Sequence, residues 1–464
     1  MQNQENMTPI ELRATAALAL VFALRMFGMF SILPVLAIHA QHLPGGATPL
    51  LVGVALGVDG LAQAFLQIPF GLLSDRYGRK RVIYAGLLLF ALGSFVAAAA
   101  DDIYLIILGR LIQGTGAIAA AVIALTADLT REEHRAKGMA VIGMSIGITF
   151  GASMVLGPAL SDWIGVPGIF TLTGVLALLA MLVVRFVVPD PRVSRVHADA
   201  ETVPAQLAAV LVNPELQRLD FGIFSLHAAM RGLFVVVPLA LLEVGGLPVS
   251  QHWKVYLPVM GISFVAVVPF IIYAERRGRM KPVFAGAVGL LLLSTLLMSV
   301  TLHHFAGLII ALFLFFLAFN LLEASLPSLV SKIAPAGSKG TAIGVYNSFQ
   351  YLGLFLGGAL GGFLAQHVGA AAVFVFASGL CFAWLLLALS MQPPPAVRTR
   401  IYQVPVLRAV PAAMLSRELA GVDGVTEAVV IAEEGVAYLK VRNGPWDEAA
   451  AKQLIERENE RWHQ

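Results

Sequence analysis

The chain has 464 residues, of which 58% are hydrophobic and only 13% are charged, and its mean hydropathy is +0.82. An ordinary soluble domain has roughly 25% charged residues, so this chain is too apolar to cover its surface with polar groups in water. The single cysteine, Cys381, excludes an internal disulfide and a cysteine-based metal site. We therefore expect lipid to be the main solvent of the chain, with no metal bound.

The apolar residues form runs of the length that crosses a membrane as a helix. A bilayer core of about 30 Å needs about 20 apolar residues per helix, and lipid permits only helices or a closed barrel. The runs lack the alternation of barrel strands, so they predict an all-α membrane protein with twelve transmembrane helices. The predicted spans are about 15–38, 50–73, 82–100, 103–127, 138–161, 168–188, 217–242, 253–274, 282–302, 305–330, 340–366 and 369–391. The first ten residues carry Glu5 and no basic residue, so we expect a retained first span rather than a cleaved signal peptide.

Basic residues gather in every second loop between the predicted spans. One set of loops holds fifteen lysines and arginines, and the other set holds Lys254 alone. Because basic loops remain in the cytoplasm, this asymmetry predicts that both termini are cytoplasmic, in a bacterial-type inner membrane. The fifteen are Arg76, Arg79, Lys80, Arg81, Arg131, Arg135, Lys137, Arg192, Arg195, Arg276, Arg277, Arg279, Lys281, Lys332 and Lys339.

The sequence repeats itself at a distance of about 200 residues. SDRYGRKR at 74–81 returns as AERRGRMK at 274–281, and GPAL at 157–160 returns as GGAL at 357–360. Parallel repeats of this kind occur in large secondary transporters. We therefore predict two six-helix bundles that have the same orientation in the membrane.

The residues beyond the last predicted span have the composition of a soluble domain. Prolines at 393–395 stiffen a linker, and strand and helix patterns then follow in the order βαββα. This order suits a small α+β ferredoxin-like domain that lacks its last strand; sensing, oligomer contact and added stability are open roles for it. The predicted units are an N-terminal bundle 1–188, a cytoplasmic linker 189–216, a C-terminal bundle 217–392, a proline-rich linker 393–398 and a cytoplasmic ferredoxin-like domain 399–464.

Three motifs resemble those of the major facilitator superfamily. GLLSDRYGRKR at 71–81 resembles its signature between spans two and three, and GRLIQGTGA at 109–117 resembles its fourth-span motif. GITFGASMVLGP at 147–158 is similar to the fifth-span motif of the drug/proton antiporter branch, although Ser161 and Asp162 follow where that branch usually has two glycines. LTREEHRAKGMAVIGMSIGITF and KGTAIGVYNSFQYLG are most similar to the YajR transporters. The resemblance implies a transporter that works by alternating access.

The loop signature is a candidate gate. A carboxylate such as Asp75 at the end of an apolar helix is costly unless it is paired. The resemblance implies that Asp75 meets the start of the eleventh span near Gly340–Thr341 and that Arg79 meets Asp128, which would clamp the two bundles together until the cytoplasmic side opens. The alternative is a solvated turn, which we favour for Arg76. The gating residues are Gly71, Asp75, Arg76, Gly78, Arg79, Lys80 and Asp128.

Charges inside the first bundle are candidates for proton coupling. At about 1.5 Å per residue, Arg25 and Asp59 both fall near the middle of the bilayer. An unpaired charge there is expensive, so we expect both to face the cavity and to pair with each other or through water. Arg110 resembles the fourth-span arginine that the family associates with proton coupling. A purely structural ion pair is the alternative for Asp59 and for Arg110.

The second bundle offers two more candidates for proton coupling. His227 lies four residues from Arg231, on the same face of the seventh span. Glu323 lies about seven residues inside the tenth span. Histidine titrates near neutral pH, and burial moves a glutamate toward the same range. A hydrogen-bonded core role is the alternative for His227, so Glu323 is the better candidate.

Glycines spaced four apart mark one face of the fifth span and one face of the eleventh. Small residues let helices approach closely in lipid, so we expect a packing role, and a bend at Gly157–Pro158. The predicted helix-packing motif is Gly147, Gly151, Gly157 and Pro158.

Aromatic and amide side chains on the spans that line the central path in this family are candidates for the substrate cavity. Such a wall suits a moderately apolar organic solute, and we see no rows of charges suited to a strong anion. Packing is the alternative for many of them. The candidates are Phe27, Phe30, Gln63, Phe65, Gln67, Gln113, Tyr346, Asn347 and Gln350.

We find no phosphate-binding loop and no nucleophile motif, which argues against an enzyme and leaves an ion gradient as the energy source. We expect proton-coupled efflux, by antiport, of a small organic solute or drug. Proton-coupled uptake by symport and a non-transporting sensor that signals through the C-terminal domain are the alternatives. The expected partners are the lipid bilayer, the solute and protons, with no cofactor and no nucleic acid. We expect a monomeric transport unit and leave contacts through the C-terminal domain open.

Overall fold

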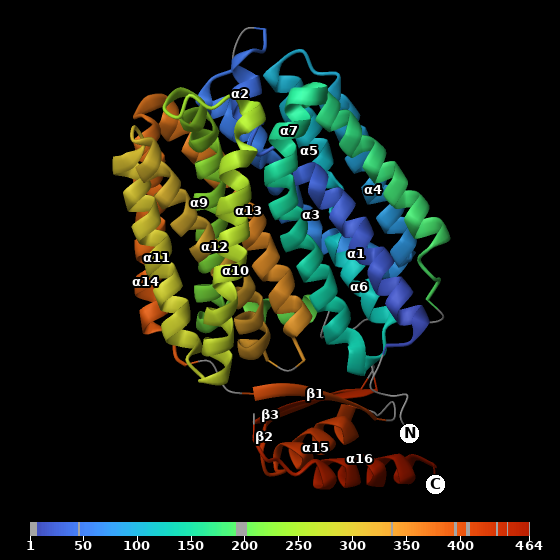
Figure 1. The fold of residues 1–464 in the computed structure, drawn as a ribbon. Coiled ribbons are helices and arrows are strands. Elements are labelled where there is room, and N and C mark those ends of the chain that lie inside the picture. The colour runs from blue at the N-terminus through green and yellow to red at the C-terminus, as the bar shows by residue number, and fades with distance from the viewer. Residues whose placement is uncertain are drawn as a thin grey trace.

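The computed structural model describes residues 7–44, 47–191, 202–335, 337–393, 397–404, 409–432, 435–442 and 444–463. Long helices form two groups that stand side by side, and a small sheet domain lies at one end of them (Figure 1). We call this end of the helices the domain end and the opposite end the far end. Arg192 and Arg195 of the predicted linker, and the prolines at 394–395, lie outside the described residues.

Some helices of the N-terminal group begin at residues whose side chains cap them. Thr8 and Glu11 form a reciprocal capping box at the start of α1. The carboxylate of Asp102 accepts a hydrogen bond of 2.8 Å from the amide of Leu105, so α5 starts directly after the predicted turn at 101–102. The group consists of α1 Pro9–Phe30, α2 Leu36–Gln41, α3 Pro49–Tyr77, α4 Arg79–Ala98, α5 Ile103–Thr115, α6 Ala119–Leu129 and α7 Glu132–Phe186.

Two predicted spans are interrupted. The first span divides into α1 and α2, and the fourth divides into α5 and α6 around residues 116–118. A Cβ on Gly116 would overlap the carbonyl oxygen of Gly86 in α4, so the backbones can approach only because glycine is there. The apolar composition continues through both interruptions, and hydropathy therefore does not detect them.

Helix α7 covers both the fifth and the sixth predicted span. It is 55 residues long and contains Gly165, whose φ of +70° is not helical and suits glycine. The chain kinks at Gly165, so α7 consists of two helical segments that are joined there. Among the described residues, eleven helical segments are long and apolar enough to cross a membrane, and Lys137–Phe186 is one of them. The count of twelve spans stays a prediction.

The C-terminal group follows a short helical linker. The linker contains η1 Pro204–Gln206 and α8 Leu207–Leu211. The group consists of α9 Pro214–Glu243, η2 Val249–Gln251, α10 Trp253–Arg276, α11 Met280–Thr301, α12 Phe305–Ile333, α13 Lys339–His367 and α14 Ala370–Ser390.

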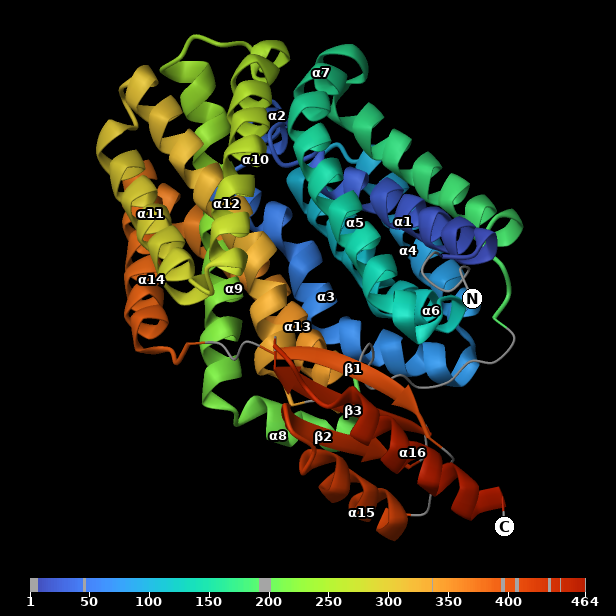
Figure 2. The ribbon, with the colours of Figure 1, turned by 60° about the horizontal axis from the view of Figure 1, so that its bottom comes forward.

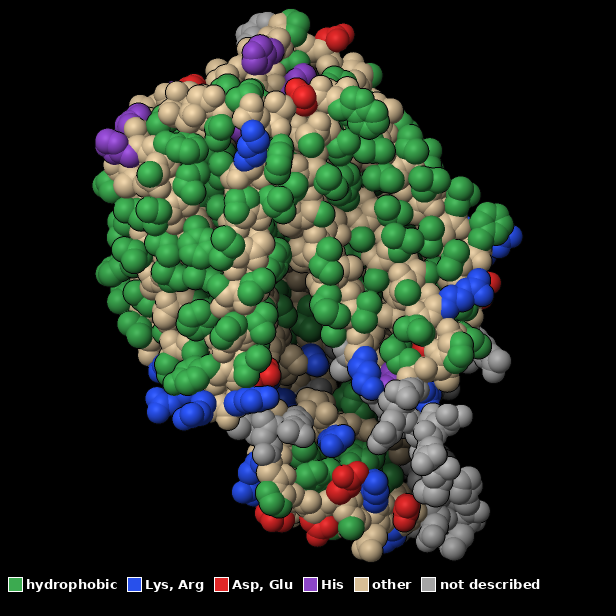
Figure 3. All heavy atoms as spheres, in the orientation of Figure 1, with side chains coloured by type: hydrophobic (Ala, Val, Ile, Leu, Met, Phe, Trp, Pro, Cys, Tyr) green, Lys and Arg blue, Asp and Glu red, His purple; other side chains and the backbone are tan. Residues whose placement is uncertain are grey.

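The two groups meet most closely along α3 and α13, toward the far end. A Cβ on Gly53 would overlap the carbonyl oxygen of Gly358, and one on Gly362 would overlap that of Pro49. Two turns closer to the centre, a Cβ on Gly60 would lie 2.6 Å from the carbonyl oxygen of Tyr351. Backbone packing of this kind brings α3 and α13 into direct contact at the far end. Toward the domain end the groups separate, and the space-filling view shows a hollow between them above the sheet domain (Figure 3).

The C-terminal domain has the predicted element order. It consists of β1 Val397–Gln403, α15 Ala409–Ala420, β2 Val425–Ile431, β3 Val436–Arg442 and α16 Glu448–His463. The strands form an antiparallel sheet in the order β1-β3-β2. Successive residues of β3 point to opposite faces, and Leu439 packs with Leu415 and Leu419 of α15. Both views place this domain at one end of the helices (Figure 1 and Figure 2).

The other face of β3 contacts the helices. The Lys440 ammonium donates hydrogen bonds to the carbonyl oxygens of Lys332, at 3.3 Å, and Ala334, where α12 ends. These carbonyls have no partner within the helix, so a lysine there caps the helix C-terminus. A Cβ on Gly337, in the loop before α13, would lie 3.1 Å from the Val429 side chain. The sheet domain thus holds the loop that joins α12 to α13.

Candidate functional site

The loop between α3 and α4 carries a buried ion network. Arg79, the first residue of α4, pairs with Asp75 one turn earlier in the chain and donates through Nε to Oδ2 of Asp128 at 3.2 Å. Its Nη1 also donates to the hydroxyl of Ser74 at 2.9 Å. Arg79 therefore ties the ends of α3 and α6 together within the N-terminal group. The expected contact between Arg79 and Asp128 is present.

The expected contact between Asp75 and the start of α13 is absent, which corrects that part of the prediction. Among the described residues, the carboxylate of Asp75 is paired with Arg79 alone, and its side chain is 21% exposed. The Thr341 hydroxyl is occupied by the linker: it accepts from the amide of Val203 at 2.9 Å and donates to Oε1 of Gln206 at 3.1 Å. The two groups are apart at this end, so the clamp is open.

The remaining loop residues have local roles. Gly78 adopts a φ of +97°, which favours glycine and allows the chain to reverse between the two helices. Lys80 pairs with Asp190 at 2.7 Å, and its hydrogen bond holds the pKa of that carboxyl below its usual range. The Arg76 guanidinium lies 5.5 Å from the Tyr77 ring centroid. A Cβ on Gly71 would lie 3.2 Å from that of Ala120 in α6.

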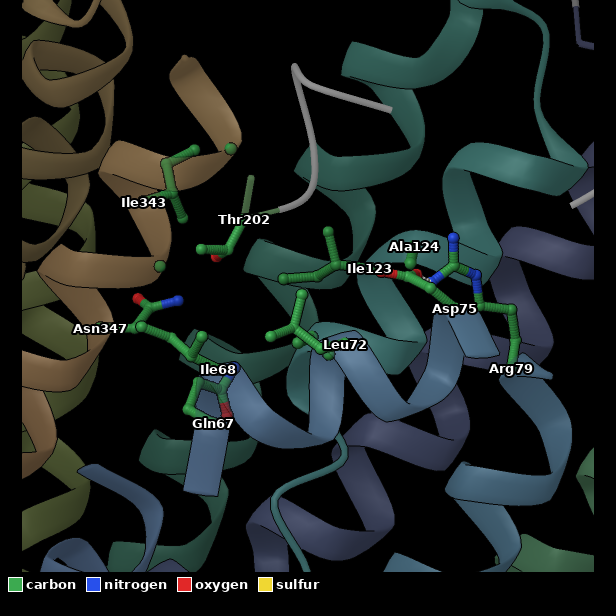
Figure 4. Close-up of a pocket in the computed structure, with 14 residues that line it drawn as sticks. Gln67, Ile68, Leu72, Asp75, Arg79, Ile123, Ala124, Thr202, Ile343 and Asn347 are labelled. Atoms are coloured by element: carbon green, nitrogen blue, oxygen red, sulfur yellow. Dashed lines mark hydrogen bonds and ion pairs between the residues drawn. The ribbon is translucent and has the colours of Figure 1, made fainter. Parts of the chain in front are cut away.

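A pocket separates the two groups next to this network. It has an empty volume of about 450 Å³, including its open mouth. Figure 4 shows Ile68 and Leu72 of α3 on one side and Ile343 and Asn347 of α13 on the other, with Thr202 of the linker between them. Two of the predicted cavity residues, Gln67 and Asn347, line this pocket.

Deeper in the helices, one acid joins the two groups. Oδ1 of Asp59 in α3 accepts from Arg110 of α5 at 2.7 Å, and Oδ2 accepts from Arg231 of α9 at 3.3 Å. All three side chains are buried. The expected direct pair between Arg25 and Asp59 is not formed, because the two arginines occupy both carboxylate oxygens. Arg231 was not among the predicted coupling residues, although a charge in an apolar span next to His227 was a usable signal.

Arg25 is tied to this cluster through an amide. Its Nη2 donates to Oε1 of Gln63 at 2.9 Å, and Gln63 lies one turn from Asp59 on α3. The guanidinium also lies 5.5 Å from the centroid of the Phe90 ring. Arg25, Gln63, Asp59, Arg110 and Arg231 form what we call the central cluster.

The second predicted proton site is a histidine beside a glutamate. His227 of α9 has its Nδ1 3.2 Å from the carbonyl oxygen of Ile223, which requires Nδ1 to donate. Nε2 then accepts from the amide of Gln350, at 2.8 Å. Oε2 of Glu323 lies 3.8 Å from the same Nε2, and the Glu323 side chain is 38% exposed. Protonation of Nε2 would turn this approach into an ion pair.

The other cavity candidates are dispersed. Phe30 packs edge-on against Phe150 with ring centroids 5.1 Å apart, and Phe27 is half-buried. Phe65 is 70% exposed, and Tyr346 is buried. The assignment of Gln113 to the cavity was wrong. Its side chain is fully buried inside the N-terminal group. It accepts from Arg110 at 3.1 Å and donates to Ser94 of α4 at 2.8 Å.

Two glycines of the predicted helix-packing motif in α7 contact neighbouring segments, and a third does not. A Cβ on Gly157 would overlap the carbonyl oxygen of Ser31 after α1, and one on Gly151 would lie 3.0 Å from the Phe264 ring of α10. Pro158 lies inside α7 without ending it. Gly147 was expected to pack but faces open space, since a Cβ there would meet nothing within 4 Å. It lies nearer the domain end, where the groups separate.

The arrangement of apolar helices around a buried polar centre defines a class of protein. Two groups of helices meet most closely along α3 and α13, charged residues lie where they meet, and a pocket opens between the groups at one end. These are the features of a multi-pass membrane transporter.

The chain belongs to the Major Facilitator Superfamily, whose sequence profile matches residues 18–358 and 273–418. It is 45% identical to the inner membrane transport protein YajR of Escherichia coli, over 95% of this chain and 96% of that one. The multidrug resistance protein MdtH of Yersinia enterocolitica is 26% identical over 72% and 82% of the chains. The predictions of this superfamily, of the likeness to YajR transporters and of a transporter rather than an enzyme are confirmed.

A solved structure shares the fold. The human organic anion transporter MFSD10 superposes with a TM-score of 0.63 over 82% of this chain and all of that one, at 20% sequence identity.

Proposed function

We propose that the protein is a proton-coupled exporter of a small organic solute that works by alternating access in the inner membrane. The observation that carries this proposal is the asymmetry between the two ends of the α3–α13 contact. The helices touch through glycines at the far end and are separated by a pocket at the domain end. The basic loops lie at the domain end, so this end faces the cytoplasm. The structure is then an inward-facing state.

The opposite state follows from the groups that are now apart. Tilting the two halves would bring Asp75 toward the start of α13, where the linker now occupies Thr341. A carboxylate at a helix N-terminus gains about 0.3–1 kcal/mol when exposed and about 2 kcal/mol when partly buried. The contact would close the pocket while the glycine contacts of the far end open. Asp75, Arg79 and Asp128 would thus act as the inner gate.

Glu323 is the proposed proton carrier. It is reachable by water in this state, and it lies beside His227, which can accept a second proton. Asp59 is fully buried between two arginines, which suits a structural ion pair that holds the halves at the pivot. We expect Glu323→Gln to exchange solute but to lose its response to a pH gradient. An undiminished response would reject Glu323 as the carrier.

Export is favoured over uptake by the name of a relative, since MdtH is called a multidrug resistance protein. Proton-coupled uptake remains the alternative within transport, and a sensor that signals through the C-terminal domain is the alternative outside it. The contact of Lys440 with the end of α12 is the feature that a sensor would use.

The proposal can be tested by locking the pocket. Cysteines at Leu72 and Ile343, on opposite walls, should form a crosslink only when the pocket closes (Figure 4). Cysteines at Leu72 and Ile123 lie on the same half and serve as the matched control. In vesicles with an internal pH dye, solute-driven proton movement should stop after the first crosslink and continue after the second. Binding of solutes without any flux or pH change in the uncrosslinked protein would instead support the sensor.

A further inference from the structure

The central cluster has more positive charge than negative charge. Arg25, Arg110 and Arg231 are each at most 1% exposed, and Asp59 pairs with two of them, Arg110 and Arg231. Glu323 belongs to the neighbouring site beside His227. Asp220 lies eleven residues from Arg231 on α9, which is about 16 Å along the helix. The cluster itself therefore has two positive charges in excess.

Some of the donors in this cluster have no partner. Nε and Nη1 of Arg25, and Nε and Nη1 of Arg231, are buried and make no hydrogen bond within the described parts of the chain. Arg110, by contrast, uses Nε, Nη1 and Nη2, on the carbonyl oxygen of Ala55, on Gln113 and on Asp59. Arg110 thus shows the pattern expected of a guanidinium with a structural role, in which all three nitrogens have a hydrogen-bond partner. Arg25 and Arg231 keep two free donors each.

Free donors on a buried cation are costly. The effective penalty for removing an ion from water is several kcal/mol even after relaxation, and a charge near the bilayer centre is retained only for a function. A guanidinium presents parallel N–H groups that match the two oxygens of a carboxylate or a phosphate. An oxyanion is the partner that the geometry of these donors matches.

The pocket ends one turn of α3 away from this cluster. Asp59, Gln63, Gln67, Gly71 and Asp75 follow each other four residues apart along α3, and each neighbouring pair lies one turn apart. The last three line the pocket, and the first two belong to the cluster. The step from Gln67 to Gln63 is about 6 Å of helix. A solute that fills the pocket is one turn away from the guanidinium of Arg25.

We infer that Arg25 and Arg231 form the binding site for the anionic group of an organic solute. This revises the expectation that the cavity lacks charges suited to an anion. The sequence does not show which residues of the two halves meet, whereas the structure brings an arginine from each half to the central cluster. Because the anion would be the transported solute, the inference rests on the proposed function and names its substrate class.

The test compares probes that differ in charge but not in size. Thermal unfolding of the purified protein in detergent is followed with benzoate, phenylphosphonate and benzenesulfonate, and with the neutral benzamide and the cationic benzylamine. At least one of the anions should raise the unfolding temperature, and the neutral and cationic probes should not. Arg25→Gln and Arg231→Gln should each weaken that effect about tenfold or more. Arg277→Gln removes an exposed charge near the domain end and should leave it unchanged.

Two further measurements keep the test decisive. Arg25→Lys retains the charge without the planar fork, so it should fold like the original protein and bind the anion more weakly. The inference is overturned if none of the anions stabilises the protein, if benzamide or benzylamine stabilises it equally, or if the effect survives in both Arg25→Gln and Arg231→Gln. Because binding is measured in detergent, anion binding without flux in vesicles would reject the transport proposal and keep the anion site. Flux of a cation without anion binding would reject the anion site and keep the transport proposal.

Discussion

Replacing Asp59 by asparagine should destabilise the protein strongly. The carboxylate pairs with Arg110 at 2.7 Å and Arg231 at 3.3 Å, and all three side chains are buried. Removal of one partner from a buried ion pair typically costs about 3–5 kcal/mol, because the other charge is left buried and unpaired. Here two guanidinium groups lose their counterion, so we expect at least the upper end of that range and a fall in unfolding temperature of about 5–10 °C.

The chain carries its own reporter for this measurement. Cys381 is its only cysteine and is fully buried in α14, so a thiol-reactive dye becomes fluorescent only as the protein unfolds. Asp101→Asn makes the same chemical change at an exposed turn and should stay within about 1 °C of the original protein. The double variant Asp59→Asn with Arg231→Gln should recover part of the loss, because it removes one of the stranded charges. If Asp59→Asn unfolds together with the Asp101 control, the central pair contributes nothing to stability and the reasoning fails.

Three further predictions concern the two ends of the helices. Gly358→Ala would push the far-end contact with α3 apart and shift the protein toward an outward-open state, which labelling from the far side should detect. The control, Gly286→Ala in α11, places its Cβ in open space and should change nothing. Asp75→Asn should slow transport severalfold while the unfolding temperature changes little, because the carboxylate is needed only when the gate closes; an unchanged rate would remove it from the gate. Lys440→Met should release the C-terminal domain from α12 and speed its removal by protease. Lys452→Met, whose ion pair is exposed, should be cut at the original rate, and equal rates for both variants would show that Lys440 does not hold the domain.

The inner gate is the part of the site that sequence reasoning locates best. Asp75 and Arg79 are four residues apart, on either side of the turn at Gly78, and belong to one recognisable motif. The state of the gate was not predictable, because the contact of Asp75 with α13 depends on how far the halves are tilted. A motif identifies the residues that can meet, whereas the structure shows one state, in which they are apart.

Hydropathy does not predict which residues pair in the central cluster. The depth of Asp59 and Arg25 in their spans followed from residue counting, but their partners did not. Asp59 and Arg231 are 172 residues apart, and no periodicity says which faces of α3 and α9 turn toward each other. The misplacement of Gln113 has the same origin, since an amide on an apolar helix can face a cavity or a neighbouring helix.

The fold, like the site, could be predicted from the sequence only in part. The repeat and the distribution of basic residues indicate two helical halves, and the soluble composition of the tail indicates a separate small domain. The break at Gly165 falls between two predicted spans, in SDWIGVPG at 161–168, whereas the interruption at Gly116 depends on the close approach of Gly86 and leaves no mark in an apolar run.

The contacts of the central cluster predict whether a proton on Asp59 and the solute would move in the same direction or in opposite directions. An anion and the carboxylate of Asp59 would both bind Arg231, so a proton that neutralises Asp59 frees the arginine and tightens anion binding. By linkage, the bound anion also favours the protonated carboxyl. Proton and anion then travel together, which is symport. Exchange in opposite directions requires the proton to sit elsewhere, and Glu323 beside His227 is the group that is exposed in this state.

The direction of proton movement therefore distinguishes the two acids. With an internal pH dye in vesicles, inward anion flux should acidify the interior if Asp59 carries the proton and should make it alkaline if Glu323 drives exchange. Under the export proposal we expect the alkaline change, abolished by Glu323→Gln. Acidification that survives in Glu323→Gln would assign the coupling to Asp59 and turn the proposed exporter into a symporter.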